Sequence, residues 1–579
     1  MKINEVEKIT GLTKKAIRLY EDRGLIRIGR SDNGYRDYSE KDIKLLNQIK
    51  LLRTAGVSIT DIKLLFSGMI SLEDIIEKRK KEIDTESGLN SERYAFCQTL
   101  AQRIASGEEK ADVLFTETDE SFEGGLGALA IGIDIGTTTI SAAVIDLDAR
   151  KQVEVFSIPH NSYVESSGLS EQSVSVIMDK ANGLLDLIYK SYTGIVSIGV
   201  TGQMHGIVYI NGDGEAVSGL INWQDKRGDI PMKNSMTACQ LIKQITGENI
   251  ATGYCIATHY YNLLNGLVPK NSVGFCSIMD YFAMRLCNIK RSITHTSIAA
   301  SFGLFDVKKE RFMLDKLVLL GIDEAFLPKV TSSNETLGRW NDIPVCVAIG
   351  DNQASFLGSV KNNRESVLVN IGTGSQISAV GDFADFGDGI ECRPLINGER
   401  LICGSALCGG SAYAMIEGFF RSYASSAGIG EGSQYAVMND LAAKAYEGGE
   451  QPLTVDTSFC GMRTAPMRRG SIANIDLNNF TPSALILGVI NGMCDELYNL
   501  YQAGHIRKNH IVASGGAIRK NNILCRVLED KFGMTVSVSS VKEEAATGAA
   551  LFSAFALGMI EYKDGFGDYI KYARKEDLK

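Results

Sequence analysis

The sequence of 579 residues lacks any apolar run close to the roughly 18 residues that a membrane-spanning helix needs. Its 12 cysteines are scattered and include no C-x-x-C pair, so neither a disulfide framework nor a zinc knuckle is indicated. The start, MKINEVEK, is too polar for a signal peptide. We therefore expect a cytoplasmic protein with reduced thiols and no membrane partner. The chain is too long for one hydrophobic core, which predicts several domains.

Acidic charge predominates, with a formal net charge of −9, but the first 70 residues differ from the rest. They hold 14 Lys and Arg against nine Asp and Glu, a balance of +5, which leaves −14 for the remainder. This asymmetry indicates that the two parts of the chain meet different partners.

The basic segment begins with two short predicted helices around the turn TGLT, and Thr13 is a good N-cap for the second helix. This pattern indicates a helix-turn-helix, with Lys14, Lys15 and Arg18 near the helix end that meets DNA. The following RSDNGYRDYS predicts a hairpin turned at Asn33-Gly34, which could reach DNA phosphates as a wing. A small charged helical bundle is the alternative for a bare helix-turn-helix pattern.

The order helix-turn-helix, LYEDRGLI, NGYRDYS and IKLLNQIKLLRTAGVSITDIKLLF resembles the MerR family of winged-helix transcription regulators over residues 1–70. The resemblance implies binding of double-stranded DNA by residues of the second helix and the wing. These residues are Lys14, Lys15, Arg18 and Tyr20 on the helix and Tyr35 and Arg36 in the wing. It also implies a homodimer formed through a long helix after this module.

A heptad series in that region supports such a helix: Ile76, Ile83, Asn90, Cys97 and Ile104. Gly88 interrupts it, so two helices with a break are the alternative to a continuous coiled coil. The acidic, Gly-ended stretch that follows reads as a linker.

A motif is repeated in the remaining residues. IDIGTTTISAAV at 133–144 recurs as VNIGTGSQISAV at 369–380, with Asp134 aligned to Asn370, 236 residues apart. Each copy predicts a strand–turn–strand hairpin whose backbone N–H groups and Thr hydroxyls can bind phosphate. Asp134 could hold a metal ion through water. One copy alone could be an ordinary hairpin, whereas two copies at a domain-sized interval predict two related lobes facing one cleft.

Between the hairpins, VAIGDNQASFLGSV predicts a strand end followed by a helix of small residues. Asp351 at that junction is placed to take a proton from an alcohol. The alternative is that it only caps the helix.

Three further stretches suggest ligand contacts. GQMHG ends an apolar strand with Gln203, Met204 and His205, although His205 alone could be a core residue. WQDKR offers an aromatic face and polar groups suited to a sugar. In ASGGAIRKN the paired glycines would let the backbone approach a flat base. The candidate residues are Trp223, Gln224, Asp225 and Arg227 in WQDKR, and Gly515 and Gly516 in ASGGAIRKN.

Residues 128–560 resemble the FGGY family of carbohydrate kinases in the motifs DIGTT, GQMHG, WQDKR, GDNQ, NIGTGS, ASGGAIRKN and EEAATGAA. The resemblance implies an α/β actin-like (ribonuclease H-like) two-lobe ATPase fold behind an all-α, winged-helix head. It also implies ATP and Mg²⁺ as cofactors and Asp351 as the general base. The residues that it implies for sugar binding are Gln203, Met204, His205, Trp223, Gln224, Asp225, Arg227 and Asn352. Those that it implies for ATP binding are Asp134, Gly136, Thr137, Thr138, Gly372, Thr373, Gly515 and Gly516. Asp134 would also position Mg²⁺.

Within the family, WQDKR and GDNQAS are more similar to sedoheptulokinases than to xylulokinases, which typically carry WND and GDNAA. The predicted activity is thus phosphorylation of a ketose, sedoheptulose first and a pentulose as the alternative. We expect a head at 1–70, a dimerisation helix and linker at 71–127, and kinase lobes at 128–361 and 362–579. We expect first a kinase that also regulates transcription, because Asp351, Asp134, both hairpins and the basic residues of the head are all present. The alternatives are a sensor with weak catalysis and a kinase whose head only dimerises or is vestigial.

Overall fold

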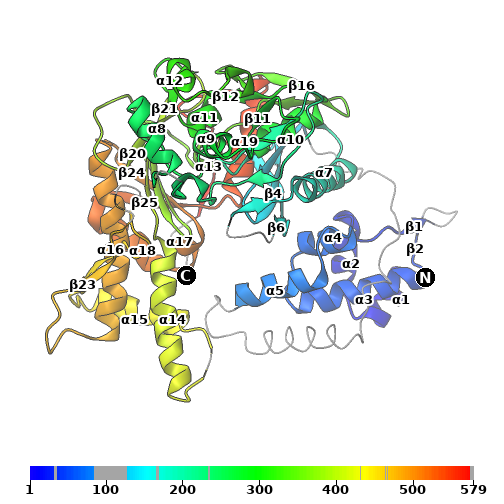
Figure 1. Ribbon diagram of the computed structural model, residues 1–579. Helices are drawn as coiled ribbons and strands as arrows, with labels where there is room; N and C mark the ends of the chain where they lie inside the picture. The colour runs from blue at the N-terminus through cyan, green and yellow to red at the C-terminus, as the bar shows by residue number, and fades with distance from the viewer. Residues whose placement is uncertain are drawn as a thin grey trace. The chain divides into compact units, whose positions relative to one another are not determined.

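The computed structural model describes residues 1–30, 35–83, 127–164, 169–232, 235–430, 432–462, 465 and 467–573. The described residues form a head (residues 1–83) and a larger region from residue 127 onward (Figure 1). In the described residues no helix is long and apolar enough to cross a membrane.

The head is helical. Gly11 ends its first helix in the left-handed conformation, and Thr13 caps the second by accepting a hydrogen bond from the Ala16 N–H. A two-residue antiparallel pair, Arg30 with Arg36, forms the base of the predicted wing, whose tip at 31–34 lies outside the described residues. The elements are α1 (Ile3–Thr10), α2 (Lys14–Asp22), β1 (Gly29–Arg30), β2 (Arg36–Asp37), α3 (Glu40–Thr54), α4 (Ile59–Phe66) and α5 (Leu72–Ile83).

The predicted heptad series is described only at its start. Ile76 lies in α5 with its side chain buried, and Ile83 is the last residue of that helix. The positions Asn90, Cys97 and Ile104 and the predicted linker at 107–126 lie outside the described residues.

Two mixed sheets form the framework of the larger region. In the first, the order is β16-β17-β8-β3-β4-β5; in the second, it is β20-β21-β19-β18-β24-β25-β26. The first-sheet strands are β3 (Leu129–Ile135), β4 (Thr139–Asp146), β5 (Lys151–Pro159), β8 (Ile195–Gly202), β16 (Thr336–Trp340) and β17 (Ile343–Cys346). The second-sheet strands are β18 (Ser366–Ile371), β19 (Ser375–Val380), β20 (Ile390–Pro394), β21 (Arg400–Ala406), β24 (His510–Ser514), β25 (Thr535–Ser539) and β26 (Tyr572–Ala573).

The two sheets repeat one topology. In each, a first strand turns antiparallel into the second, and a later strand returns parallel to the first: β8 beside β3, and β24 beside β18. A further strand runs parallel to that returning strand, β17 beside β8 and β25 beside β24. The predicted repeat is therefore confirmed, and the hairpin turns lie beside the carboxyl ends of β8 and β24.

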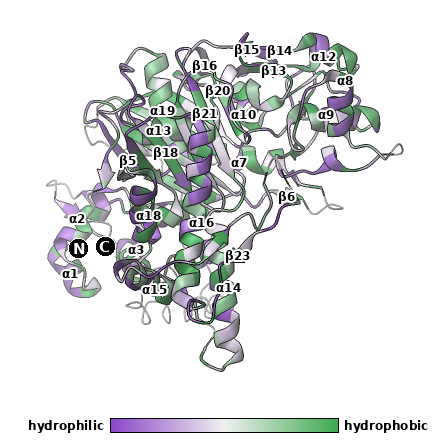
Figure 2. Ribbon diagram, turned by 90° about the vertical axis from the view of Figure 1, so that its left-hand side faces the viewer, coloured by the Kyte–Doolittle hydropathy of each residue, from purple (hydrophilic) through white to green (hydrophobic). Residues whose placement is uncertain are grey.

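Helix α13 (Asp351–Ser359) follows β17, and helix α19 (Glu544–Ala556) follows β25. They cross at glycines: a Cβ on Gly548 would lie 1.8 Å from the Ala354 carbonyl oxygen, and one on Gly358 would lie 2.0 Å from that of Glu544. Figure 2 shows apolar residues concentrated on these helices and on the sheets. The first turn of α13, where Asp351 lies, is thus held against Gly548, one turn into α19, whereas the first residue of α19 meets the last turn of α13.

Further elements in the first lobe extend it beyond its sheet. They are β6 (Tyr163–Val164), β7 (Glu171–Gln172), α7 (Val174–Ser191), β9 (Val208–Ile210), β10 (Leu220–Ile221), η2 (Arg227–Asp229), α8 (Ala238–Thr246), α9 (Cys255–Leu264), β11 (Gly274–Cys276), α10 (Ile278–Leu286), β12 (Ile293–His295), α11 (Thr296–Ala299), η3 (Ala300–Phe302), β13 (Phe305–Asp306), β14 (Arg311–Phe312), α12 (Leu314–Leu319), η4 (Glu324–Phe326) and β15 (Lys329–Thr331).

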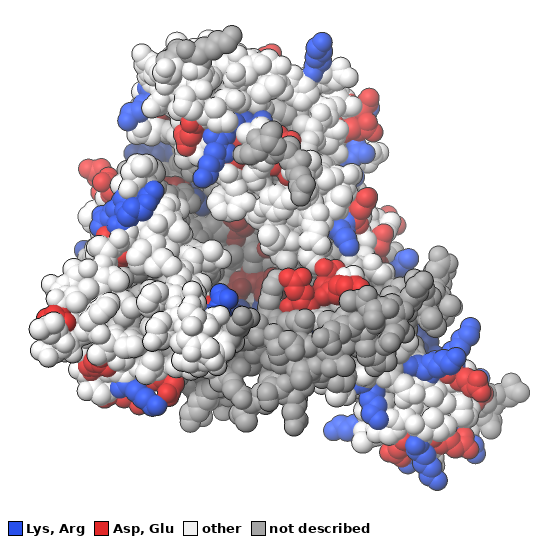
Figure 3. Space-filling model, turned by 60° about the horizontal axis from the view of Figure 1, so that its bottom comes forward, with Lys and Arg blue, Asp and Glu red and all other residues white. Residues whose placement is uncertain are grey.

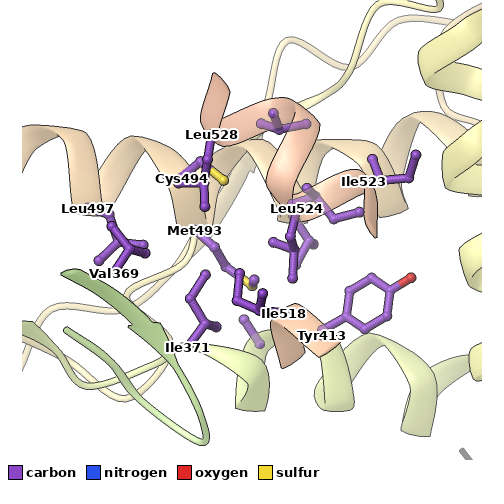
Figure 4. Packing of buried hydrophobic residues seen from close by; sticks show 14 of the residues in the cluster. Val369, Ile371, Tyr413, Met493, Cys494, Leu497, Ile518, Ile523, Leu524 and Leu528 are labelled. Atoms are coloured by element: carbon purple, nitrogen blue, oxygen red, sulfur yellow. The ribbon is translucent and has the colours of Figure 1, made fainter. Parts of the chain in front are cut away.

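In the second lobe a core forms between the sheet and its helices. Figure 4 shows side chains of β18, α16 and α18 packed together there, among them Ile371, Met493 and Leu524. The remaining elements of this lobe are α14 (Gly410–Ser426), α15 (Tyr435–Glu447), β22 (Thr454–Asp456), β23 (Ser471–Ala473), α16 (Pro482–Ala503), α17 (Gly516–Lys520) and α18 (Asn522–Phe532).

Candidate active site

The first hairpin turns at Gly136, Thr137 and Thr138, between β3 and β4, and closes through the Gly136 N–H donating to the Thr139 carbonyl at 3.0 Å. Gln172 Nε2 donates to the Thr137 carbonyl at 2.7 Å and fixes the turn from outside. The Thr138 side chain stays exposed. Hydroxyls and N–H groups at such a turn are suited to binding phosphate oxygens.

The second hairpin turns at Gly372, Thr373 and Gly374, and α14 begins directly against it. The N–H groups of Gly409 and Ser411 donate to the Thr373 carbonyl at 2.9 and 3.1 Å. A Cβ on Gly409 would lie 2.4 Å from the Gly374 carbonyl oxygen, so only glycine permits this approach. Sequence reasoning missed this Gly409-Gly410 pair, although the run LCGGSA was its signal. The positive end of a 17-residue helix dipole thus adjoins the predicted phosphate turn.

Two further carboxylates act on Asp134 near the carboxyl end of β3. The pKa of Asp134 is raised to about 8, first by burial and then by the charges of Asp351 and Glu543. Asp134 ends β3, Asp351 begins α13, and Glu543 directly precedes α19. Sequence reasoning missed Glu543.

This concentration of negative charge fits a divalent cation. Within the described chain no group of three metal-ligating side chains is close enough to form a protein cage. Mg²⁺ usually keeps several waters and uses one or two carboxylates plus substrate phosphates, so Asp134 beside a phosphate turn suits the ion.

Asp351 is the first residue of α13, and Gly350 is the N-cap. The alternative role of helix cap is therefore not what the structure shows for this side chain. Burial raises the pKa of Asp351 to about 6, while the charge of Arg393 and the Asn352 N–H oppose that rise. Its Oδ1 accepts from that N–H at 2.6 Å, and the carboxylate keeps some exposure to solvent. A base with a pKa near 6 is ionised at neutral pH yet still able to accept a proton.

The GQMHG loop packs against this base. A Cβ on Gly350 would lie 2.9 Å from the Met204 sulfur, so Met204 adjoins the start of α13. His205, at a φ of 72°, places its Nδ1 2.9 Å from the Ser301 carbonyl and its ring 4.4 Å from that of Tyr254. Sequence reasoning missed Tyr254. Gln203 donates to Gln172 at 2.9 Å, whereas its buried Oε1 has no partner within the described part of the chain.

The residues of WQDKR separate into two pairs. Trp223, 45% exposed, donates from Nε1 to the Thr137 hydroxyl at 3.0 Å, so a predicted sugar contact touches a predicted phosphate contact. Gln224 accepts from the Tyr163 hydroxyl at 2.8 Å.

Asp225 and Arg227, both predicted sugar contacts, form a buried ion pair. Arg227 is 3% exposed and donates to Asp225 at 2.8 Å, to Glu171 at 2.7 Å and to Asn262 at 2.9 Å. These hydrogen bonds hold the loop that carries Trp223, and a contact of either residue with the sugar stays a prediction.

Asn352 is likewise buried and paired. Its Oδ1 accepts from the Cys403 thiol at 3.0 Å, and its Nδ2 donates to the Ser378 hydroxyl at 3.4 Å. The predicted sugar contact is thus placed as a link between α13 and the second sheet.

Gly515 and Gly516 follow β24 as expected. Gly515 has a φ of 97°, and a Cβ there would lie 2.4 Å from the Ile371 carbonyl oxygen, so the turn requires glycine. A Cβ on Gly516 would meet nothing within 4 Å, so its face is open, as a site for a planar base requires.

In the head, Lys15 and Arg18 are exposed on α2. Lys14 forms an ion pair with Glu7, with 3.6 Å between its Nζ and Glu7 Oε2. In the wing, Tyr35 is 72% exposed, and Arg36 forms an ion pair with Glu21 at 2.6 Å. Figure 3 shows Lys and Arg side chains interspersed with Asp and Glu on the face of the molecule that is turned to the viewer.

Tyr20 differs from its prediction as a DNA contact. It is 6% exposed and belongs to the core of the head with Val6 and Ile17, because it lies on the inner face of α2.

Comparison with known proteins agrees with this arrangement. Residues 129–358 match the model of the FGGY family of carbohydrate kinases, N-terminal domain, and residues 395–557 match that of its C-terminal domain. Residues 1–69 match the MerR HTH family regulatory protein model.

Among curated relatives, mouse sedoheptulokinase is 26% identical over 469 residues, covering 73% of this chain and 96% of that protein. Xylulose kinase of Staphylococcus xylosus is 25% identical over 463 residues, covering 74% and 90%. Among solved structures, gluconate kinase from Lactobacillus acidophilus superposes with a TM-score of 0.67 at 20% identity, over 77% of this chain and 93% of that one. Xylulose kinase from the same organism gives 0.65 at 20% identity, over 77% and 93%.

Proposed function

The chain belongs to the FGGY family of carbohydrate kinases and carries a MerR-type helix-turn-helix head, and we propose that it transfers the γ-phosphate of ATP to a ketose and binds DNA. It is a phosphotransferase with an alcohol group as acceptor. In this proposal the DNA-binding head spans residues 1–70, the dimerisation helix and linker 71–127, and the two kinase lobes 128–361 and 362–579. The protein forms a homodimer in the cytoplasm.

One observation carries the catalytic part: Asp351 lies between the loop that holds Met204 and His205 and the carboxylate of Asp134 beside the first phosphate turn. In the proposed mechanism Asp351 accepts the proton of the sugar hydroxyl, and the resulting oxygen attacks the γ-phosphorus in line. When bound, Mg²⁺ would neutralise charge on the phosphates.

The chain's own groups supply the rest. Thr137, Thr138 and Thr373 would bind phosphate oxygens, and Gly515 and Gly516 would lie under the adenosine. Gln203 and His205 would bind the sugar, and the unpaired Oε1 of Gln203 is a ready acceptor for a sugar hydroxyl.

Sedoheptulose is the proposed acceptor because mouse sedoheptulokinase aligns over nearly its full length and the motifs WQDKR and GDNQAS favour that group. A pentulose is the second candidate, since Staphylococcus xylosus xylulose kinase aligns almost as well.

The test is ADP release with MgATP and sedoheptulose, D-xylulose, D-ribulose or D-fructose, run beside Asp351→Asn. We expect turnover on one sugar and a loss of about 10²–10⁴-fold in the variant. Sugar binding without turnover on any ketose would instead favour a sensor, in which ligand binding acts on the DNA-binding head.

A further inference from the structure

Strand β20 of the second lobe carries two charged residues toward the first lobe's base. Glu391 and Arg393 are two positions apart, so they share one face of the strand. In the ladder with β21 they pair with Cys403 and Leu401, both of which belong to a core cluster that includes α13 residues. This face is therefore turned toward the helix that begins with Asp351.

Hydrogen bonds fasten the first turn of α13 to the same strands. Gln353 Nε2 donates to the Pro394 carbonyl at 2.9 Å, and the Cys403 thiol donates to Asn352 Oδ1 at 3.0 Å. The two residues after Asp351 are thus tied to the immediate neighbours of Arg393 and Glu391.

Arg393 is only 7% exposed, and its Nε and Nη2 both donate to Glu391 Oε2, at 2.9 and 2.6 Å. A guanidinium in that position is costly to desolvate, and replacing a buried ion pair by apolar side chains of similar volume is often neutral for stability. The buried pair is therefore weak evidence for a purely stabilising role.

Glu391 also connects the pair to the sugar loop. Its Oε1 accepts from the Tyr254 hydroxyl at 3.5 Å, and the Tyr254 ring lies 4.4 Å from that of His205. The ion pair therefore lies between His205 on one side and Asp351 on the other. The charge of Arg393 also opposes the burial-induced rise in the pKa of Asp351, consistent with their proximity.

We propose that Arg393, oriented by Glu391, is a sugar-binding residue supplied by the second lobe. Its guanidinium donates to an oxygen of the ketose next to the hydroxyl that Asp351 deprotonates. This inference rests on the proposed kinase function. A polyhydroxylated ketose offers carbonyl and hydroxyl acceptors, and bound in this way it would touch residues of both lobes at once.

The experiment compares Arg393→Gln with the wild type in sugar KM, ATP KM and sugar dissociation constant measured by calorimetry. Loss of a charge-assisted hydrogen bond predicts a rise of about 10- to 100-fold in sugar KM and dissociation constant. The ATP KM should stay within about twofold, since only uniform sugar binding is removed. Glu391→Gln should give a smaller rise, because it only orients Arg393.

Arg400→Gln is the matched control. Arg400 is on β21, opposite Pro394, and its guanidinium lies over the Phe383 ring at 4.4 Å, so its loss should leave sugar KM unchanged. If Arg393→Gln fails to fold because Glu391 is left unpaired, the double variant with Glu391→Gln removes both charges and should show the same rise. An unchanged sugar affinity in the folded variant, or equal changes in sugar and ATP KM, would overturn the proposal.

The calorimetric arm separates the two hypotheses. A wild type that binds a ketose without turnover refutes the proposed kinase function, while the effect of Arg393→Gln on sugar affinity still decides the inference.

Discussion

Replacing Gly548 by Ala should disable catalysis from a position outside the site. The new Cβ would lie 1.8 Å from the Ala354 carbonyl oxygen, whereas real Cβ contacts essentially never fall below 3.0 Å. Helices α13 and α19 must therefore separate locally by about 1 Å, and a displacement of about 1 Å at a reacting group can cost about 100-fold in rate. Because Asp351 begins α13, we expect kcat to fall by that order.

The same overpacking should destabilise the fold by about 1–3 kcal/mol. Initial rates with MgATP and the preferred ketose, with thermal unfolding run alongside, measure both effects. Gly418→Ala is the control: it replaces a glycine within α14 where a Cβ would meet nothing within 4 Å, and helix propensity favours alanine there by about 1 kcal/mol. A Gly548→Ala protein with wild-type kcat and unfolding temperature would refute the reasoning.

Other predictions follow from single contacts. Asp351 must be ionised to accept a proton, and its pKa is raised to about 6. We therefore expect kcat/KM for the sugar to fall as the pH drops through 6 and to reach about a tenth of its plateau value at pH 5. A flat profile from pH 5 to 7 would contradict the role of Asp351 as the base. Arg227→Met leaves Asp225 buried without its partner and should lower the free energy of unfolding by about 3–5 kcal/mol. Denaturant unfolding measures this change, and Arg339→Met, which replaces an exposed arginine of β16, is the control. The double variant Lys15→Ala and Arg18→Ala should bind double-stranded DNA more weakly than the wild type. The slope of log affinity against log salt concentration, measured by fluorescence anisotropy, should fall by about 2. An unchanged slope would show that these residues do not contact phosphates.

Features confined to short stretches of sequence could be predicted well. Both hairpins were readable because a Gly-Thr turn between two apolar runs is a local pattern, and their repetition indicated the two sheets. Thr13 was predictable as a cap because capping needs only a side-chain oxygen three residues before an N–H.

Features that depend on distant packing could not. The segment IECRP reads as an ordinary strand, and only the pairing of β20 with β21 beside α13 brings Arg393 near Asp351. The hydrogen bonds of Arg227 could not be predicted either, because its partners Glu171 and Asn262 lie 56 and 35 residues away in the chain. The burial of Tyr20, which the MerR resemblance implied to be a DNA contact, likewise depends on the packing of α2 in the core of the head.

The central claim is that this chain phosphorylates a ketose with Asp351 as the base. Mass spectrometry of each sugar after incubation with MgATP and the full chain tests it most directly. A phosphate ester on one ketose with the wild type, and none above background with Asp351→Asn in the same time, is the predicted result. ADP formation without a phosphorylated sugar, or equal product from the variant, would contradict the account.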